Sequence, residues 1–281
     1  MADLYTPVET LPPARPVTVL AIETATRSVG CALWGDDGPL ASFELVAGQR
    51  HSEVLMPAVD ELCMRAGVSK RDISGVVADV GPGLFTGLRV GLATALAIAT
   101  GRGIPAAGVT SLEALAHGVR HRAGLVASVV DARRGEVFWS LYRSDGEELV
   151  ELRAPSVAGP EQAAAEVAGA LRREGAGRGE RAVLVVGDGG WRYREVFEAA
   201  GGEHAGPLAV WPSPLVVAEL GLPRLGAGAG HAGSPGVALA PVYLRQADVR
   251  PGWDEVGGRV GHSAAAGPGR RVTDAPGQDA G

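Results

Sequence analysis

The chain has 281 residues, with 32 acidic and 26 basic side chains, which gives a formal net charge of −6 at pH 7 and a pI near 5.6. This balance argues against a free-standing nucleic-acid-binding protein, because such proteins need a basic surface to replace phosphate counterions. Lys70 is the only lysine and follows Ser69, which excludes the Gly-Lys-Ser/Thr loop of the P-loop nucleoside triphosphatases. Any contact with RNA is therefore expected to run through a partner.

Residues 1–16, MADLYTPVETLPPARP, form a proline-rich leader that lacks the basic and apolar regions of a secretory signal. No run of the sequence reaches the roughly 20 apolar residues that cross a bilayer. Cys31 and Cys63 stand far apart, and we interpret both as small core residues in a reducing compartment. We therefore expect a cytoplasmic protein without membrane contact.

Residues 17–116 are predicted to form a first lobe, in which a meander of three strands precedes alternating helices and strands. Apolar runs of strand length and helix-period patterns carry this prediction. Because strands that alternate with helices usually pair in parallel, the later part favours a mostly parallel sheet faced by helices. The expected strands are 17–22, 29–34, 40–46, 75–80 and 106–109, and the expected helices are 52–66, a segment after Thr86 and a segment from Ser111.

Residues 117–245 are predicted to form a second lobe that repeats the plan of the first. An apolar strand at 125–131 ends in an acid and is followed by a polar turn and a return strand at 137–142, as in the first lobe. Two lobes of related α/β topology follow, and the C-terminal segment of this range is a candidate to pack back on the first lobe. Further expected elements are helices at 161–174, 193–200 and 214–220, a strand at 183–186, a flexible loop at 226–236 and a disordered tail at 246–281.

The segment VGPGLFTGLRVG, residues 80–91, combines a rigid turn with the start of an almost uncharged helix. Gly81 and Gly83 permit backbone angles that side chains disfavour, and Thr86 is the predicted N-cap. The helix carries no charge from residue 90 to residue 100, so tertiary contacts must cover most of its circumference. A ridge of small residues every fourth position predicts a close helical partner, inside or outside the chain, with an ordinary core helix as the alternative: Gly87, Gly91, Ala95 and Ala99.

Glu23 and Asp131 each end the first strand of a lobe beside a polar turn. Two-lobed phosphotransferases of the actin and sugar-kinase type hold phosphate and magnesium at this position, with small turns whose N–H groups reach the phosphates. Here the first turn has no glycine before Gly30, and the second places Arg133 and Arg134 where glycines are expected. A working nucleotide site is therefore disfavoured.

Two further groups of polar residues have structural interpretations. His117 and His121 could share a helix face and hold a metal, but a solvated helix end explains them better. Arg89, in the first turn of its helix, is expected to meet a carboxylate or phosphate nearby, and a simple surface ion pair with an acid such as Asp79 is the preferred interpretation. In the segment from Arg50 to Glu53, Ser52 is the predicted N-cap and His51 has no assigned role.

Six spaced motifs give the chain a resemblance to a known family: IETATRSVGCALW (22–34), RHSEVLMP (50–57), VGPGLFTGLRVGLATA (80–95), GVTSLEALA (108–116), VVDARRGEVF (129–138) and PVYLR (241–245). The chain resembles the TsaB family of bacterial tRNA threonylcarbamoyladenosine biosynthesis proteins over roughly residues 17–245. The resemblance implies an actin-like fold, of ribonuclease H-like topology, with mixed sheets flanked by helices. It also implies a non-catalytic scaffold or activator that pairs with the catalytic paralogue TsaD, alongside the ATPase TsaE. The complex modifies the adenosine next to the anticodon of tRNAs that decode ANN codons, so the chain meets tRNA indirectly.

The resemblance also bears on metal, cofactor and partner sites. TsaD carries a metal-binding histidine pair in the segment that resembles GVTSLEALA, where Ser111 and Leu115 stand here, so no metal and no cofactor are expected in the isolated chain. The partner surface is expected on the first-lobe helices, and a homodimer is expected when the partner is absent. The expected partner-binding residues are Leu55, Val59, Leu62, Gly87, Arg89, Gly91, Ala95 and Ala99. The alternative is a stand-alone phosphotransferase that uses Glu23 and Asp131, or a metallopeptidase-like enzyme.

Overall fold

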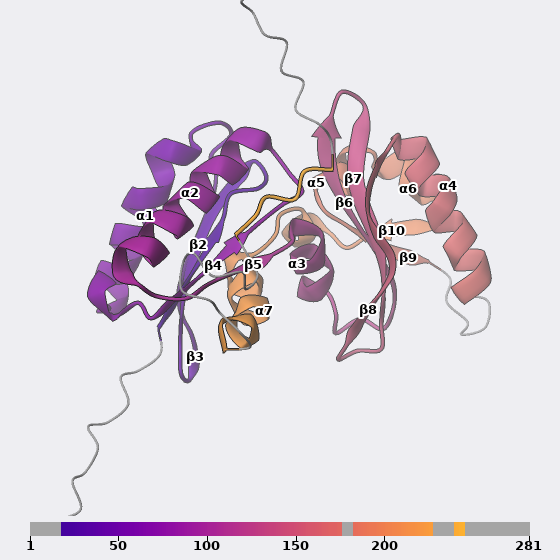
Figure 1. Cartoon of the computed structure of the whole chain (residues 1–281). Helices are drawn as coiled ribbons and strands as arrows, with labels where there is room; N and C mark the ends of the chain where they lie inside the picture. Colours follow the sequence, from indigo (N-terminus) through magenta and orange to yellow (C-terminus); the bar gives the residue numbers. More distant parts are fainter. Residues whose placement is uncertain (1–17, 176–181, 227–238, 245–281) are drawn as a thin grey trace, which may run out of the picture. The chain divides into compact units, whose positions relative to one another are not determined.

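The computed structural model describes residues 18–175, 182–226 and 239–244, and it contains two five-stranded mixed sheets (Figure 1). In the first sheet the strands lie in the order β3-β2-β1-β4-β5. The first three strands pair antiparallel, whereas β1, β4 and β5 run parallel. The strands are β1 (Val19–Glu23), β2 (Ser28–Gly35), β3 (Gly38–Val46), β4 (Gly75–Asp79) and β5 (Ala106–Val109).

The second sheet repeats this order and these directions as β8-β7-β6-β9-β10. The predicted class, α/β with two lobes of actin-like, ribonuclease H-like topology, is therefore confirmed. Strands β8 and β10 were not predicted, because β8 mixes charged, small and apolar residues and β10 has only three residues. The strands are β6 (Gly124–Arg133), β7 (Glu136–Ser144), β8 (Leu149–Ala158), β9 (Val183–Val186) and β10 (Gly202–His204).

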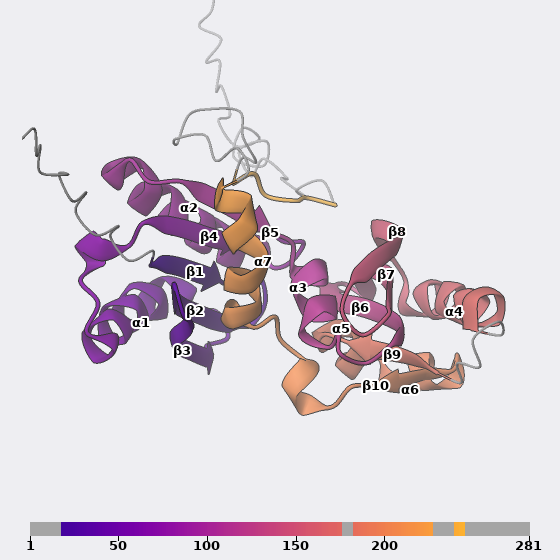
Figure 2. The ribbon, with the colours of Figure 1, turned by 90° about the horizontal axis from the view of Figure 1, so that it is seen from below.

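Helices cover both faces of the first sheet. Helices α1 (His51–Ala66) and α2 (Phe85–Arg102) bury their apolar faces against Leu20, Ile22 and Cys31. Helix α7 (Pro214–Gly226) packs on the opposite face, where Val217 meets a cluster that includes Ala21 and Val77 (Figure 2). A short 3₁₀ helix spans Lys70–Asp72. The first core thus lies on both sides of strands that are buried throughout.

The second sheet is covered in the same way. Helices α4 (Pro160–Ala170) and α6 (Arg194–Ala199) pack on one face around Trp139, and α3 (Ser111–Gly118) packs on the other around Val126. The short helix α5 (Asp188–Arg192) lies against β6. A π-helical turn at Leu171–Gly175 follows α4, and a 3₁₀ helix spans Pro207–Ala209.

Two helices cross over between the sheets. Helix α3 follows the first sheet in sequence but packs on the second, and α7 follows the second sheet but packs on the first. The two helices contact each other, and Arg224 of α7 pairs with Glu113 of α3. The predicted boundary between residues 116 and 117 therefore runs through a helix of the second lobe.

The predicted helix starts are wrong in detail. Helix α2 begins at Phe85 after Leu84, and Thr86 lies inside its first turn rather than at the N-cap. Helix α1 begins at His51 with Arg50 at the N-cap, so Ser52 does not cap it and the helix has no capping side chain. Both helices instead gain stability from the apolar contacts of their buried faces.

The predicted leader at 1–16, loop at 226–236 and tail at 246–281 fall outside the described residues, apart from Gly226 at the end of α7. Among the residues that are described, no helix is both long enough and apolar enough to span a bilayer.

Candidate functional site: two carboxylate pairs

In the first lobe, Glu23 and Asp79 end the neighbouring parallel strands β1 and β4, which pair Ile22 with Ala78 in register. Both carboxyl groups are almost fully buried. Glu23 Oε1 accepts a hydrogen bond from the N–H of Ala25 at 2.8 Å. Asp79 Oδ1 accepts two, from the Gly81 N–H and from Ser111 Oγ, each at 2.7 Å. The predicted ion pair between Arg89 and Asp79 is therefore wrong, because Asp79 bonds inward.

The second oxygen of each carboxyl group, Glu23 Oε2 and Asp79 Oδ2, is buried and has no hydrogen-bond partner in the described part of the chain. Burial raises the pKa of Asp79 to about 7, although the bonds from Ser111 and Gly81 act in the opposite direction. The pKa of Glu23 lies well above its usual value, first because of burial and then because of the charge of Asp79. Two like charges without a cation are costly at this depth, so the pair retains a proton near neutral pH.

The turn after β1 is occupied by the start of α2 rather than left open. Thr24 Oγ1 donates to the carbonyl of Gly87 at 2.9 Å, and the Leu84 N–H donates to the carbonyl of Ala25 at 2.6 Å. A Cβ atom on Gly83 would lie 2.1 Å from the Ala25 carbonyl oxygen, and one on Gly87 would lie 2.2 Å from that of Thr24. The N–H groups of Ala25 and Ser28 are occupied as well, by Glu23 Oε1 and Thr26 Oγ1, so they are not free to cradle a phosphate.

The ridge of small residues on α2 therefore has an intramolecular role. A Cβ atom on Gly91 would lie 2.1 Å from Thr24 Oγ1 and 3.4 Å from a methyl group of Ile22. Ala95 is fully buried within the core that includes β1, and Ala99 is fully buried as well. The prediction of a close helical partner is corrected, since the glycines admit the β1 strand end and its turn.

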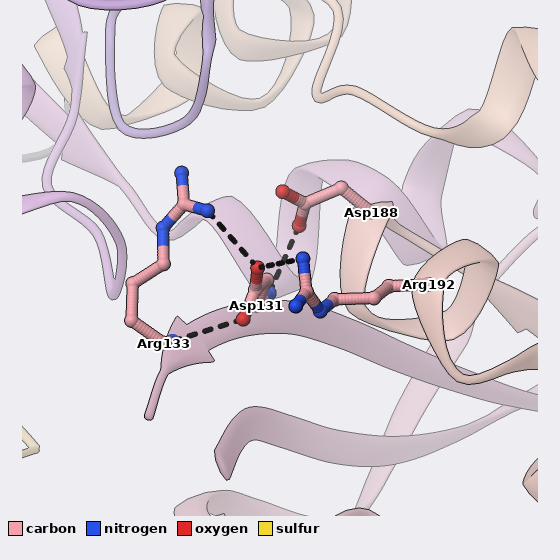
Figure 3. Close-up of polar contacts among 4 residues, drawn as sticks. All are labelled: Asp131, Arg133, Asp188 and Arg192. Atoms are coloured by element: carbon pink, nitrogen blue, oxygen red, sulfur yellow. Dashed lines mark hydrogen bonds and ion pairs between the residues drawn. The ribbon is translucent and has the colours of Figure 1, made fainter. Parts of the chain in front are cut away.

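The second lobe places another carboxylate pair at the corresponding strand ends, as shown in Figure 3. Asp131 lies in β6, and Asp188 begins α5 directly after the neighbouring strand β9. Asp188 Oδ1 accepts the N–H of Asp131 at 2.9 Å, and Asp131 Oδ1 accepts the N–H of Arg133 at 2.9 Å. Asp131 Oδ2 lies 3.4 Å from Arg133 and 3.8 Å from Arg192, so two guanidinium groups reach this carboxylate.

Arginine side chains therefore surround the second pair where the first pair has none. Arg133 and Arg134 adopt φ values of +64° and +57°, and Gly135 follows at +77°, which forms the tight turn between β6 and β7. Burial raises the pKa of Asp188 to about 6, with the charge of Asp131 adding to the rise and that of Arg133 opposing it. The prediction that Glu23 and Asp131 mark equivalent positions holds, but it missed Asp79 and Asp188 as their partners. An acid at or just after the end of an apolar strand, one or two residues before a glycine, was the available signal.

The histidines do not form a metal site in the described residues, where no group of three or more His, Cys, Asp or Glu side chains could hold one ion. His117 lies 3.6 Å from Glu219 of α7, a contact that the sequence did not reveal. His51, which the sequence left without a role, is buried and donates from Nε2 to the Thr26 carbonyl at 2.8 Å. Ser111 bonds to Asp79 and Leu115 lies in the second core, so neither side chain faces a shared metal position.

Seven of the eight expected partner-binding residues are buried in the chain's own core, on the sides of α1 and α2 that face away from solvent. Arg89 is the exposed one, and its guanidinium lies 3.7 Å from the centre of the Phe85 ring. The large exposed apolar side chains of these helices are Met56, Met64, Phe85 and Leu96. The buried seven are Leu55, Val59, Leu62, Gly87, Gly91, Ala95 and Ala99.

Comparison with known families gives a match to a model described as TsaD, tRNA N6-adenosine threonylcarbamoyltransferase, over residues 45–187. The matched stretch covers 143 of the 281 residues, which is just over half of the chain. The chain belongs to this family. The match includes α1, α2, Asp79 and Asp131, and it leaves out Glu23 and Asp188.

Curated relatives include two named tRNA threonylcarbamoyladenosine biosynthesis protein TsaB. The one from Escherichia coli is 36% identical over 147 residues, which is 50% of this chain and 63% of the relative. The one from Bacillus subtilis is 39% identical over 127 residues, or 45% of this chain and 56% of the relative. The match thus spans less than two thirds of either relative, but it confirms the resemblance to TsaB proteins that the motifs carry.

Among solved structures, YeaZ from Pseudomonas aeruginosa superposes with a TM-score of 0.66 at 25% identity. The superposition covers 81% of this chain and all of the YeaZ chain. The likeness therefore extends over both sheets, well beyond the stretch that the sequence comparisons match.

Proposed function

We propose that this chain is a non-catalytic scaffold and activator subunit of the bacterial complex that transfers a threonylcarbamoyl group to the adenosine next to the anticodon of tRNAs decoding ANN codons. Its partner is a TsaD-type catalytic paralogue, with TsaE as the ATPase, and tRNA is met through the complex. The subunit acts in the cytoplasm without a cofactor of its own, and it forms a homodimer when the partner is absent. The family match and the TsaB relatives support this assignment.

The observation that carries the non-catalytic assignment is the state of the two carboxylate pairs. A phosphotransferase needs ionised carboxylates that face substrate and a turn that reaches phosphate. Glu23 and Asp79 are instead buried, and the turn after β1 is packed against α2. Arg133 and Arg192 form ion pairs with Asp131 at its Oδ2 atom. Both sites are therefore built for stability rather than turnover.

The outer surface of α1 and α2 supports a binding role. Leu96 is 51% exposed and Met64 is 66% exposed, on helices whose opposite sides are packed against the first sheet. Exposed apolar side chains on two adjacent helices are typical of a protein interface. We therefore place the partner surface on these exposed residues, with the buried residues holding the helices in position.

The test is assembly with the catalytic paralogue, followed by tRNA modification. We expect co-elution in size exclusion and stimulated threonylcarbamoyl transfer for the wild type. Leu96→Arg is expected to fold but to lose co-elution, because a cation would enter an apolar interface. Val150→Arg is the matched control, since Val150 is 57% exposed on β8 of the other lobe.

Two outcomes would overturn the proposal. One is a wild-type chain that neither co-elutes with the paralogue nor changes its activity. The other is ATP turnover by the isolated chain that disappears in Asp131→Asn, which would indicate the stand-alone enzyme. Equal assembly of Leu96→Arg and Val150→Arg would move the interface away from α2.

A further inference from the structure

Residues 191–194, with the sequence WRYR, alternate aromatic and basic side chains where α5 ends and α6 begins. The two preceding glycines bring α5 close to the second sheet. A Cβ atom on Gly189 would lie 2.8 Å from a backbone carbon of β6, and one on Gly190 would lie 2.6 Å from a side chain of β9. Trp191 comes next and is 42% exposed. A large aromatic ring therefore stands at the surface of a helix that packs tightly on the sheet.

The ring of Trp191 has a fixed position. Its backbone N–H donates to the Gly187 carbonyl at 3.0 Å. Its ring lies nearly perpendicular to that of His204, with the two ring centres 4.9 Å apart. His204 ends β10, which lies two strands away from β6 in the sheet, so this contact is separate from the carboxylate of Asp131. A ring that is already held in place loses little conformational entropy when it binds a ligand.

Arg194 lies over the Trp191 ring without resting on it. The guanidinium carbon is 5.8 Å from the ring centre, whereas that of Arg89 is 3.7 Å from the centre of Phe85. Arg194 is exposed and makes no ion pair within the part of the chain that the structure describes. Two stacked layers of roughly 3.5 Å each need about 7 Å, so a shift of about 1 Å in this side chain would admit a planar ring.

The surroundings of Trp191 are charged rather than aliphatic. Arg192 is 59% exposed and lies 3.8 Å from Asp131 (Figure 3). The exposed acids of α6 are Glu195 and Glu198, and neither pairs with an arginine in the described residues. Apart from Trp191, α5 and α6 expose no large apolar side chain among the residues described, in contrast to α1 and α2. A lone aromatic ring between cations is typical of a base-stacking surface, whereas a protein interface has an apolar core.

We propose that Trp191 and Arg194 hold an unpaired base of RNA between them, with Arg192 beside the adjacent phosphate. Proteins bind the splayed bases of single-stranded RNA by stacking them on aromatic side chains and on guanidinium planes. The proposal deepens the proposed function, on which only the identity of the RNA as a tRNA rests. The net charge of −6 keeps RNA affinity of the isolated chain low at physiological salt, so the surface acts mainly as one contact within the complex.

The experiment measures binding of a labelled single-stranded RNA of about six nucleotides to the full chain by fluorescence anisotropy, in low salt to strengthen the contact. Trp191→Ala is expected to weaken binding at least about fivefold, because a stacked base is lost. Trp191→Phe keeps a ring and is expected to retain most of the affinity. Arg194→Gln is expected to weaken binding and to reduce its dependence on salt.

Two exposed residues of the same lobe, outside residues 191–194, supply matched controls. Leu208→Ala removes an apolar side chain that is 98% exposed, and Arg172→Gln removes an exposed arginine. Both variants are expected to bind the RNA as the wild type does. Circular dichroism checks that every variant is folded.

Four outcomes would overturn the proposal. They are no RNA binding even in low salt, equal effects of Trp191→Ala and Leu208→Ala, equal affinity for the same RNA as a duplex, and equal affinity for AMP. Loss of co-elution with the catalytic paralogue in Trp191→Ala, with RNA binding unchanged, would assign the surface to a protein and reject RNA. The titration needs no paralogue, so its failure leaves the proposed function standing, and a wild type that fails to co-elute leaves the RNA result readable.

Discussion

The two lobes share one topology and place a carboxylate pair at the same strand ends, but they stabilise the pair by different means. Glu23 and Asp79 lie in a buried site with hydrogen-bond donors, and no cationic side chain of the described residues pairs with them. Asp131 and Asp188 lie beside Arg133 and Arg192 (Figure 3). Burial favours a retained proton on the first pair, whereas two guanidinium groups lie beside Asp131 in the second pair.

This difference shows how one fold can lose a reactive site in two ways. In the first lobe the start of α2 packs directly on the backbone of the strand-end turn, a close approach that three glycines on or before that helix permit. In the second lobe, Arg133 of the turn between β6 and β7 and Arg192 of α5 lie beside the carboxylate of Asp131. The first solution depends on packing and the second on charge, so they respond to different perturbations.

The largest effect is expected from Gly87→Ala, which tests the packing in the first lobe. The new Cβ atom would lie 2.2 Å from the Thr24 carbonyl oxygen, a backbone atom that cannot move without displacing β1. We expect a loss of about 2–3 kcal/mol in the free energy of unfolding, measured by chemical denaturation. Gly101→Ala is the control in the same helix: nothing lies within 4 Å of its Cβ position, so a gain of up to about 1 kcal/mol is expected. Equal effects would show that α2 does not press on the turn.

The free energy of unfolding should depend on pH over different ranges for the two carboxylate pairs. Where burial raises a carboxyl pKa, the folded state holds a proton that the unfolded chain releases, so stability is highest at low pH and falls as the pH rises through that window. The window runs from about 4 to about 7 for Asp79, and only to about 6 for Asp188. Each retained proton contributes a slope of up to about 1.4 kcal/mol per pH unit.

Asp79→Asn is expected to flatten the slope between pH 6 and pH 7 and to raise stability at pH 8. The amide keeps an oxygen for Gly81 and Ser111 and carries no charge at any of these pH values. Asp188→Asn should leave the slope above pH 6 unchanged. Denaturation at several pH values checks both variants, and a flat wild-type profile above pH 6 would contradict a shared proton in the first lobe.

The smallest effect is expected from the charge balance of the second lobe. Arg133→Gln removes an ion pair whose arginine is 46% exposed, so the loss of stability should stay below about 1 kcal/mol and disappear in high salt. Arg27→Gln, which breaks no ion pair in the described residues, should leave stability unchanged at every salt concentration. A salt-independent loss in Arg133→Gln would show that the side chain acts by packing instead.

The positions of most strands were predictable because apolar periodicity depends on residues that are close together in the sequence. The runs around Leu20, Val77 and Val129 each gave a strand that the structure contains, and the repeat of strand, acid and turn revealed two lobes. The helix starts were not predictable from capping residues. Thr86 and Ser52 had the right chemistry for an N-cap, but the helices begin after Leu84 and Arg50, and neither helix has a capping side chain.

The partner residues on α1 and α2 show the limit of pattern analysis. The apolar surface of such helices must be buried by other protein segments. The sequence could not show whether a partner protein or the chain's own sheet buries it. The structure assigns that cover to β1 and its turn for Gly87, Gly91 and Ala95. The exposed residues of the same helices, such as Leu96, were less conspicuous in the sequence because single exposed apolar residues are common.

The sequence by itself determined the α/β class, the two related halves and the acids that end their first strands, because these features depend on residues close together in the chain. Only the tertiary structure decided which groups meet those acids. Ser111 reaches Asp79 across 32 positions, and Arg192 of α5 reaches Asp131 of β6. Such partners are set by strand order and helix packing, so they depend on contacts between distant segments that no local pattern records.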